Sequence, residues 1–162
     1  MTDEGQTTEK PLVFATEEEK AYVLKVLPQQ EPFRFVDNIV ELTEKHIVTQ
    51  RRFRPDEYYY KGHFPGDPVT PGVILLETMA QGGLVSLGIH IVRYDPNALR
   101  IRTLFSDCAV DFLNVVYPGN LVTVRGELVF WRRNKMKCKI EMTLEDGKVA
   151  ATGHLSGFGV VI

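Results

Sequence analysis

Two hydrophobic patterns divide this chain. From residue 72 to about residue 91, apolar side chains fall on every face of a helical projection, and no polar stripe interrupts them. At about 1.5 Å of rise per residue, this segment predicts a helix about 30 Å long. A helix that is apolar all round lies inside other structure, so we expect the rest of the chain to wrap around it.

The second pattern is the alternation that is typical of strands. It is clearest over 135–145, where apolar residues at every second position are separated by lysine, glutamate and threonine. The apolar set is Met136, Cys138, Ile140, Met142 and Leu144. One face of this strand is therefore expected to pack against the core while the other meets water. Less regular patterns predict strands over 35–42, 46–53, 100–112, 121–131 and 148–161.

Turn residues separate the last four strands. The turns are Pro118-Gly119-Asn120, Arg133-Asn134 and Asp146-Gly147. Short turns join antiparallel strands, so the sequence predicts an α+β fold with an antiparallel sheet of five to seven strands wrapped around one long central helix. At 162 residues the chain has the size of one domain, which we place at 16–162. Residues 1–15 are expected to be disordered, as polar termini often are.

The domain begins with a helix signal. Thr16 and Glu19 have the spacing of a capping box, in which each side chain bonds the backbone N–H of the other residue. The helix is expected to end near Leu27, because Pro28 pushes the residue before it out of the α region.

Composition narrows the class of protein. With 44% hydrophobic residues, 25% charged residues and a formal net charge of -2, the chain matches a soluble globular protein and offers no electrostatic reason to bind nucleic acid. Cys108 and Cys138 fit neither a disulfide framework nor a metal-ligand spacing, so we expect reduced thiols and a cytoplasmic location. The acidic N-terminus lacks the features of a signal peptide. The charge-free run 78–92, at 15 residues, is shorter than the roughly 18 needed to span a membrane.

Candidate chemistry is concentrated between Tyr58 and Gln81. Three prolines and three glycines constrain the backbone over 62–72, more than a simple connector needs. Within the helix that follows, Glu77 is the only charged residue. A buried carboxyl is costly unless it is paired, hydrogen-bonded or protonated, so Glu77 is either a proton donor with a raised pKa or a residue on a turn that reaches the surface. Gln81, one turn later, either orients this carboxyl or packs as a satisfied amide.

His63 is the histidine that the constrained loop holds, 14 positions before Glu77. Histidine suits general-base work because its ordinary pKa lies near 6.5. A metal site formed by His63, Asp67 and Glu77 is an alternative, although the spacing matches no known ligand pattern. At Gly72 the first N–H groups of the helix lack intrahelical partners and form a site for developing negative charge. The other histidines, interpreted as structural, are His46, His90 and His154.

A base, an acid and an oxyanion site on an apolar helix describe abstraction of a proton α to a carbonyl, with loss of a β leaving group. The segment that holds them, YYYKGHFPGDPVTPGVILLETMAQ over 58–81, resembles the signature of the hot-dog-fold β-hydroxyacyl-ACP dehydratases of FabZ type. LPQQEPFRFVD from Leu27 resembles their LPHRYPFLLVD segment, and DFLNVVYPGNLV from Asp111 resembles their FRRPVVPGDQL segment. The resemblance covers about 27–161.

This resemblance implies a hot-dog fold that dimerises into a continuous sheet, often as a trimer of dimers, with active sites at the dimer interface. It implies that His63 removes the α-proton, that Glu77 of the partner subunit assists departure of the β-hydroxyl, and that the Gly72 backbone N–H binds the thioester carbonyl. The reaction is then (3R)-3-hydroxyacyl-ACP to trans-2-enoyl-ACP and water, with no metal or redox cofactor.

The implied partner is an acyl carrier protein, which is acidic, so a basic rim is expected near the acyl tunnel. The candidates for this rim are Arg51, Arg52, Arg100, Arg102, Arg132 and Arg133. Gln29, Gln30 and Glu31 stand where the family segment has His, Arg and Tyr. GDPVTPG also resembles the GDPVMPG of the FabA dehydratase/isomerases, which carry Asp where this chain has Glu77. Two other functions stay open, a hot-dog acyl thioesterase and a non-catalytic acyl-binding hot-dog module.

Overall fold

The computed structural model describes residues 10–162 of the chain. Its helices are α1 (Glu17–Val26), α2 (Gly72–Met79) and α3 (Ser86–Val92), with the 3-10 turns η1 (Tyr58–Lys61) and η3 (Ala98–Arg100) and the π-helical segment η2 (Ala80–Val85). Its strands are β1 (Asn38–Leu42), β2 (His46–Arg52), β3 (Ile101–Phe112), β4 (Leu121–Arg132), β5 (Lys135–Leu144) and β6 (Val149–Val161). The predicted helices and strands are all found within a few residues of their expected bounds. The sequence pattern did not predict η1, η3 or the π geometry of η2.

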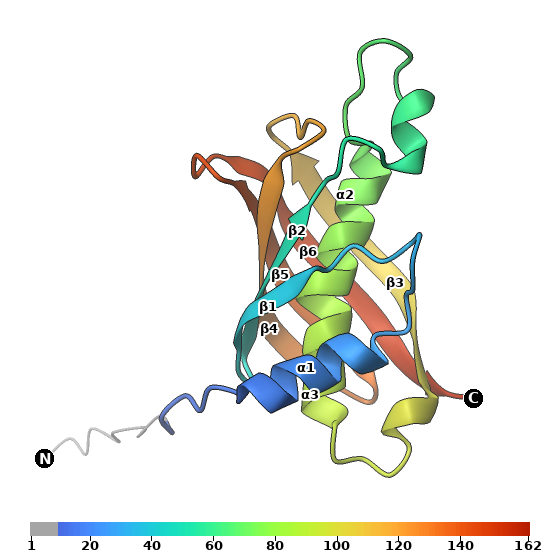
Figure 1. Cartoon of the computed structure of the whole chain (residues 1–162). Coiled ribbons are helices and arrows are strands. Elements are labelled where there is room, and N and C mark those ends of the chain that lie inside the picture. Colours follow the sequence, from blue (N-terminus) through green and yellow to red (C-terminus); the bar gives the residue numbers. More distant parts are fainter. Residues whose placement is uncertain (1–9) are drawn as a thin grey trace, which may run out of the picture.

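The six strands form one antiparallel sheet in the order β1-β2-β4-β5-β6-β3. Figure 1 shows this sheet curving behind the central helix, with β3 on the opposite side of the helix from β1. The predicted α+β hot-dog architecture is therefore confirmed. The turn at Pro118 does not join neighbours, because β3 pairs with β6 whereas β4 lies between β2 and β5.

The segments α2, η2 and α3 form one continuous central helix, Gly72–Val92, of 21 residues. It is long and apolar enough to cross a membrane, but 72% of its apolar window is buried inside the fold, as in the core helix of a soluble protein. In Figure 1 the sheet lies behind this helix and α1 crosses in front of it near α3. The surrounding structure confirms what the all-round apolar pattern predicted.

The central helix approaches the sheet closely at η2, where glycine residues have no side chains to keep the two apart. A Cβ added to Gly126 of β4 would collide with the backbone of Gly83, and a Cβ added to Gly82 would collide with Thr49 of β2. A Cβ on Gly83 would lie 2.8 Å from the side chain of Ile140 in β5. The three glycines therefore allow helix and sheet backbones to come nearer than any other residue type would permit.

The N-terminal end of the fold begins as predicted. Thr16 and Glu19 bond each other's backbone N–H at the start of α1, which confirms the capping box. Residues 10–15 form no helix or strand. The expected disorder of 1–15 stays a prediction, and for residues 1–9 it lies outside the described residues.

The prediction that Arg51 belongs to the basic rim is wrong. Its side chain is 1% exposed and lies over the rings of Phe35 and Phe53, at 5.5 and 6.0 Å from their centroids. It pairs with Asp37 at 2.9 Å and with Glu57, so both carboxylates compensate the buried charge. The alternation of β2 places Arg51 on the inward face of the sheet, where it supports the core and cannot meet a partner protein.

Candidate functional site

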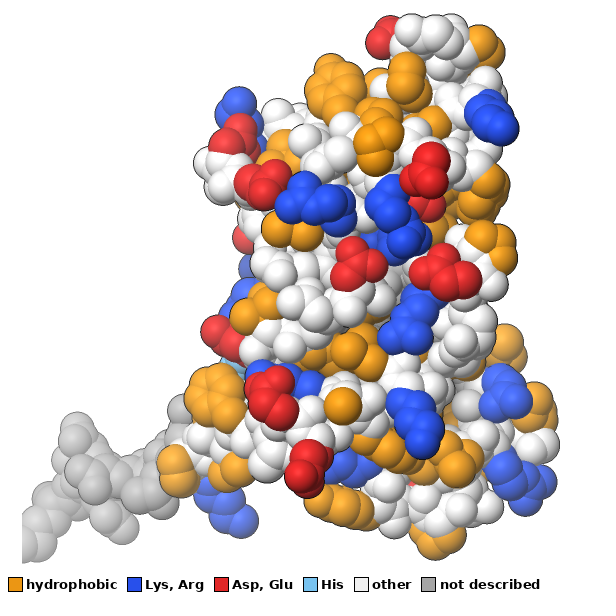
Figure 2. Space-filling view, viewed as in Figure 1, with side chains coloured by type: hydrophobic (Ala, Val, Ile, Leu, Met, Phe, Trp, Pro, Cys, Tyr) orange, Lys and Arg blue, Asp and Glu red, His pale blue; other side chains and the backbone are white. Residues whose placement is uncertain are grey.

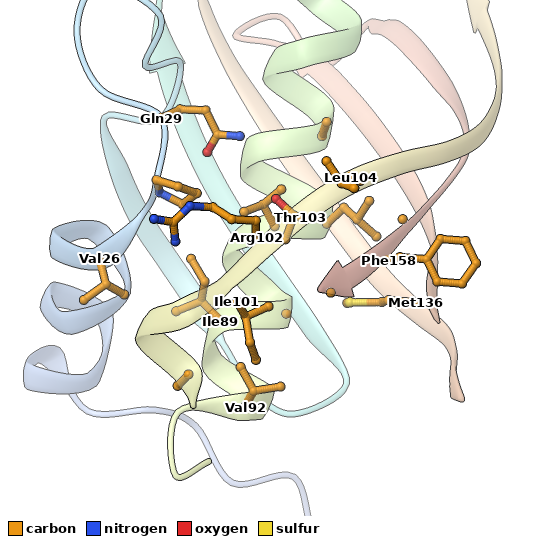
Figure 3. A pocket seen from close by; sticks show the side chains of 18 of the residues that line it. Val26, Gln29, Ile89, Val92, Ile101, Arg102, Thr103, Leu104, Met136 and Phe158 are labelled. Carbon is orange, nitrogen blue, oxygen red and sulfur yellow. The ribbon is translucent and has the colours of Figure 1, made fainter. Parts of the chain in front are cut away.

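The site begins with a cavity beside the central helix. It has a volume of about 300 Å³ and lies between α1, the central helix and the start of β3 (Figure 3). Glu77 is the one acidic residue among the described residues that line it. Apolar side chains from α1, the central helix and the sheet line much of the remainder, among them Val26, Ile89, Val92 and Ile101.

Gln81 fixes the carboxyl group of Glu77. Gln81 is fully buried, and its Oε1 accepts the backbone N–H of Phe35 at 2.7 Å, which sets the orientation of the amide. Its Nε2 donates to the carbonyl of Phe33 and to Oε1 of Glu77, both at 2.9 Å. Because Oε1 of Glu77 accepts this bond, a proton on the carboxyl group sits on Oε2. Gln81 is thus a satisfied packing amide that also orients Glu77.

Burial raises the pKa of Glu77, and the hydrogen bond from Gln81 lowers this pKa by a smaller amount. The net effect keeps the carboxyl protonated to a higher pH than that of an exposed glutamate. A carboxyl with these properties suits the role of general acid near neutral pH.

His63 lies in the loop between η1 and α2, which extends beyond the sheet at the top of Figure 1. Its Nδ1 is 3.0 Å from the carbonyl oxygen of Val69. Because a carbonyl can only accept, Nδ1 carries the hydrogen, and Nε2 of the neutral ring keeps a free lone pair. The N–H of Val69 donates back to the carbonyl of His63 at 3.1 Å, and the imidazole stacks on Phe64 with ring centroids 4.1 Å apart. The loop therefore holds an imidazole whose basic nitrogen is available.

Gly72 is the first residue of α2 and follows Pro71. The ring of Phe112, at the end of β3, lies 3.6 Å from the place where a Cβ on Gly72 would stand. The first N–H groups of the helix have no partner within the helix, so they can bind an oxygen atom that gains negative charge. This helix start directly follows the loop that carries His63.

One chain does not bring all of the predicted site residues together. Glu77 lines the cavity, whereas His63 and Gly72 are not among the residues that line it. The metal alternative has no support in the structure: within residues 10–162, no three His, Cys, Asp or Glu side chains are grouped so that they could hold a metal ion.

Sequence reasoning missed Gln29 and Gly88 as part of the cavity wall, and it named Arg102 only as a candidate for the basic rim near the acyl tunnel. A count of three or four residues along the helix from Glu77 would have found Gly88, because such positions share a face. Gln29 and Arg102 come from the loop after α1 and from β3, and no local pattern connects them with the helix. Figure 3 shows the Gln29 side chain beside the cavity, and Gln29 Oε1 is buried without a hydrogen-bond partner among the described residues.

Comparison with known proteins identifies relatives of this chain. The family model of the FabA-like domain matches residues 27–154. The 3-hydroxyacyl-[acyl-carrier-protein] dehydratase FabZ of Ruminiclostridium cellulolyticum is 31% identical over 134 residues, which cover 82% of this chain and 91% of that protein. The FabZ of Thermus thermophilus is 34% identical over 134 residues, which cover 83% of this chain and 92% of that protein.

Solved structures agree on the fold. The dehydratase heterocomplex ApeI:P from Xenorhabdus doucetiae matches with a TM-score of 0.69 and 17% identity, over 85% of this chain and 90% of that chain. A hypothetical thioesterase with coenzyme A from Streptococcus pneumoniae matches with a TM-score of 0.55 and 14% identity, over 90% of this chain and 98% of that chain. At these identities the structures support the fold alone. The family model and the FabZ relatives, which cover most of the sequence, show that this chain belongs to the FabA-like family as a hot-dog protein of the FabZ dehydratase type.

Proposed function

We propose that the protein dehydrates (3R)-3-hydroxyacyl-ACP to trans-2-enoyl-ACP in the biosynthesis of fatty acids or related acyl chains, with His63 as base and Glu77 as acid. The observation that carries this proposal is the carboxyl group of Glu77, whose pKa is raised by burial in the wall of an apolar cavity and which Gln81 holds by one oxygen. A carboxyl group with a raised pKa beside an apolar cavity suits protonation of a leaving group on an acyl chain.

The chemistry follows from the orientation of each group. Nε2 of His63 takes the proton from C2 of the substrate, and the electrons of the broken C–H bond form the double bond between C2 and C3. The C3–O bond breaks, and Oε2–H of Glu77 protonates the departing hydroxyl group, so that water leaves. The N–H of Gly72 binds the thioester oxygen, which gains negative charge as C2 loses its proton.

The site is completed by a second copy of the chain. Glu77 lines the cavity of its own protomer and His63 does not, which favours a base supplied by the partner subunit. Strand β3 supports this arrangement, because it forms an edge of the sheet and exposes Leu104, Phe105 and Phe112 by 56, 49 and 50%. Pairing of two β3 edges would cover these side chains and give a continuous sheet. Assembly of three such dimers into a hexamer stays a prediction.

The acyl carrier protein is proposed to bind near the cavity, in the cytoplasm. Arg102 lines the cavity and is exposed, so it stays a candidate for this contact. The other exposed candidates are Arg52, Arg100, Arg132 and Arg133. Figure 2 shows Lys and Arg side chains interspersed with Asp and Glu on the face in view, without one large basic field. The interaction is therefore expected to depend on a few cations and to weaken with added salt.

The test supplies purified protein with 3-hydroxyacyl-ACP and follows two products. Formation of the enoyl thioester without release of thiol supports the proposal. Release of free thiol, detected with a thiol-reactive dye, would identify a thioesterase instead. Tight binding of an acyl thioester without any turnover would identify an acyl-binding module.

A further inference from the structure

The cavity follows one stripe of the central helix. The helix residues that line it include Glu77, Ala80, Leu84, Gly88 and Val92, each three or four positions after the one before. Such positions lie above one another on a single face, so the cavity extends along the helix from the carboxyl group of Glu77 towards the end of α3.

Gly88 is the one position on this stripe without a side chain. A Cβ at Gly88 would lie 3.4 Å from Sδ of Met136 and 3.7 Å from the ring of Trp131, and both residues also line the cavity. These are ordinary contact distances, so close packing does not require glycine here, in contrast with Gly82 and Gly83. Side chains added at Gly88 would instead take up space in the cavity.

The surroundings of Gly88 are apolar. Its neighbours in the cavity wall are Met136 and Trp131 from the sheet and Ile89 and Val92 from the helix. Figure 3 shows Ile89, Val92 and Ile101 close together at the α3 end of the cavity, while Gln29, from the loop after α1, lies beside the cavity farther from Val92. A hydrocarbon chain suits these apolar side chains, whereas a charged or hydroxylated chain end would lose its hydration beside them.

The distance between Gly88 and Glu77 gives the length of hydrocarbon chain that fits between them. The two residues are 11 positions apart, which corresponds to about 16 Å along a helix. An extended hydrocarbon advances about 1.3 Å per carbon, given C–C bonds of about 1.5 Å. With C3 of the substrate beside Glu77, about a dozen further carbons reach Gly88.

We propose that Gly88 determines acyl-chain length, and that its lack of a side chain lets the cavity accept long, unsubstituted chains of about 14 to 16 carbons. This inference rests on the proposed dehydratase function, because it places C3 of the substrate at Glu77. Leu84 and Ala80 contact the first part of the chain, and the space beside Gly88 receives its end.

The test compares Gly88→Ala and Gly88→Leu with the unaltered protein on 3-hydroxyacyl-ACP substrates of about 4 to about 16 carbons. Gly88→Leu is expected to lower kcat/KM for the longest chain about tenfold or more and to keep kcat/KM for the shortest chain within about twofold of the unaltered protein. For the longest chain, Gly88→Ala should have a kcat/KM between those of Gly88→Leu and the unaltered protein. The matched control is Ala21→Leu, which adds the same kind of bulk on the exposed side of α1. It is expected to change neither value.

Binding of hexadecanoyl-pantetheine, measured by calorimetry, gives a second readout that does not need turnover. Gly88→Leu is expected to weaken this binding and to leave that of butanoyl-pantetheine unchanged. Equal loss on short and long chains, or no loss on long chains, would overturn the role of Gly88. Failure of the dehydratase proposal looks different, because the unaltered protein would then form no enoyl product at any chain length while the binding comparison still tests Gly88.

Discussion

The central helix uses small residues for opposite purposes on its two sides. Towards the sheet, Gly82 and Gly83 allow the backbone to press against β2, β4 and β5, where an added Cβ would collide. Towards the cavity, Ala80 and Gly88 leave space, and a Cβ at Gly88 would meet only ordinary contacts. The composition of the helix does not distinguish the two sides. The surface that each side faces determines whether a missing side chain allows close packing or opens a binding space.

Glu77, the proposed acid, lies on the cavity side of the central helix, but its carboxyl group is held by a residue of the packed interior. Glu77 lines the cavity, while Gln81, fully buried, connects its carboxyl group with the backbone at Phe33 and Phe35. The tightly packed side therefore provides a rigid support, and the open side provides access for a substrate.

The largest expected effect of a substitution is on catalysis, at Glu77 on the cavity side of the central helix. Glu77→Gln removes the proton that assists departure of the hydroxyl, so kcat is expected to fall by about 10² to 10⁴, or about 3 to 5 kcal/mol in activation free energy. The amide oxygen can still accept the bond from Gln81, so the thermal unfolding temperature should not fall. Activity and unfolding measured on the same preparation separate the two effects, and retained turnover would exclude Glu77 as the acid.

The next largest effect is expected at Gln81, which connects Glu77 on the cavity side of the helix with the packed interior. Gln81→Met leaves the N–H of Phe35 and the carbonyl of Phe33 without partners, which should lower the free energy of unfolding by about 2 to 3 kcal/mol. It also removes the hydrogen bond that lowers the pKa of Glu77, so this pKa should rise further.

The pH dependence of activity distinguishes orientation from packing. The proposed role of Glu77 requires the protonated carboxyl group, so activity should be lost as the pH rises through its pKa. A higher pKa in Gln81→Met therefore moves the alkaline limb of the pH–kcat profile to higher pH. Tyr22 of α1 and Arg102 of β3 are the other titratable or charged side chains that line the same cavity as Glu77. An unchanged alkaline limb, with only stability reduced, would mean that Gln81 merely packs.

On the packed side, Gly126→Ala places a Cβ against the backbone of Gly83. Overpacking of this kind should lower the free energy of unfolding by about 1 to 3 kcal/mol, because the helix must move away from the sheet. Chemical denaturation of both proteins measures this difference. A variant as stable as the parent would show that the close approach of helix and sheet is not a constraint.

The smallest effect is expected at the glycine on the open side. Gly88→Ala should raise the free energy of unfolding by about 0.5 to 1 kcal/mol, since alanine is the better helix former and the added Cβ meets no collision. The same denaturation experiment measures it. Destabilisation as large as that of Gly126→Ala would remove the distinction between the two sides.

The sequence predicted the features that depend on local pattern. Alternation located the strands, and the lone charge of Glu77 in an apolar helix marked the candidate acid. The inward position of Arg51 and the pairing of β3 with β6 depend on residues far apart in the chain. The alternation of β2 held a signal for Arg51, because inward positions of a strand are buried.

The residues of the candidate site also fall into two groups, those that a local sequence pattern predicts and those that only the fold brings together. His63 was found because the proline and glycine residues around it constrain the loop, and the structure adds the bond to Val69 that leaves Nε2 free. Gln29 and Arg102 reach the cavity from separate elements, so only the fold brings them to Glu77. The meeting of His63 with Glu77 depends on a second chain and stays a prediction.

Each active site is proposed to combine His63 of one protomer with Glu77 of the other. The most direct test of this shared site mixes His63→Ala with Glu77→Ala after joint unfolding and refolding, and measures formation of enoyl-ACP. If the chains pair at random in a two-fold dimer, half of the dimers are mixed and each has one intact site. A site shared between protomers should therefore restore about a quarter of the unaltered activity from two inactive proteins. A mixture as inactive as its components, with mixed dimers present, would contradict it.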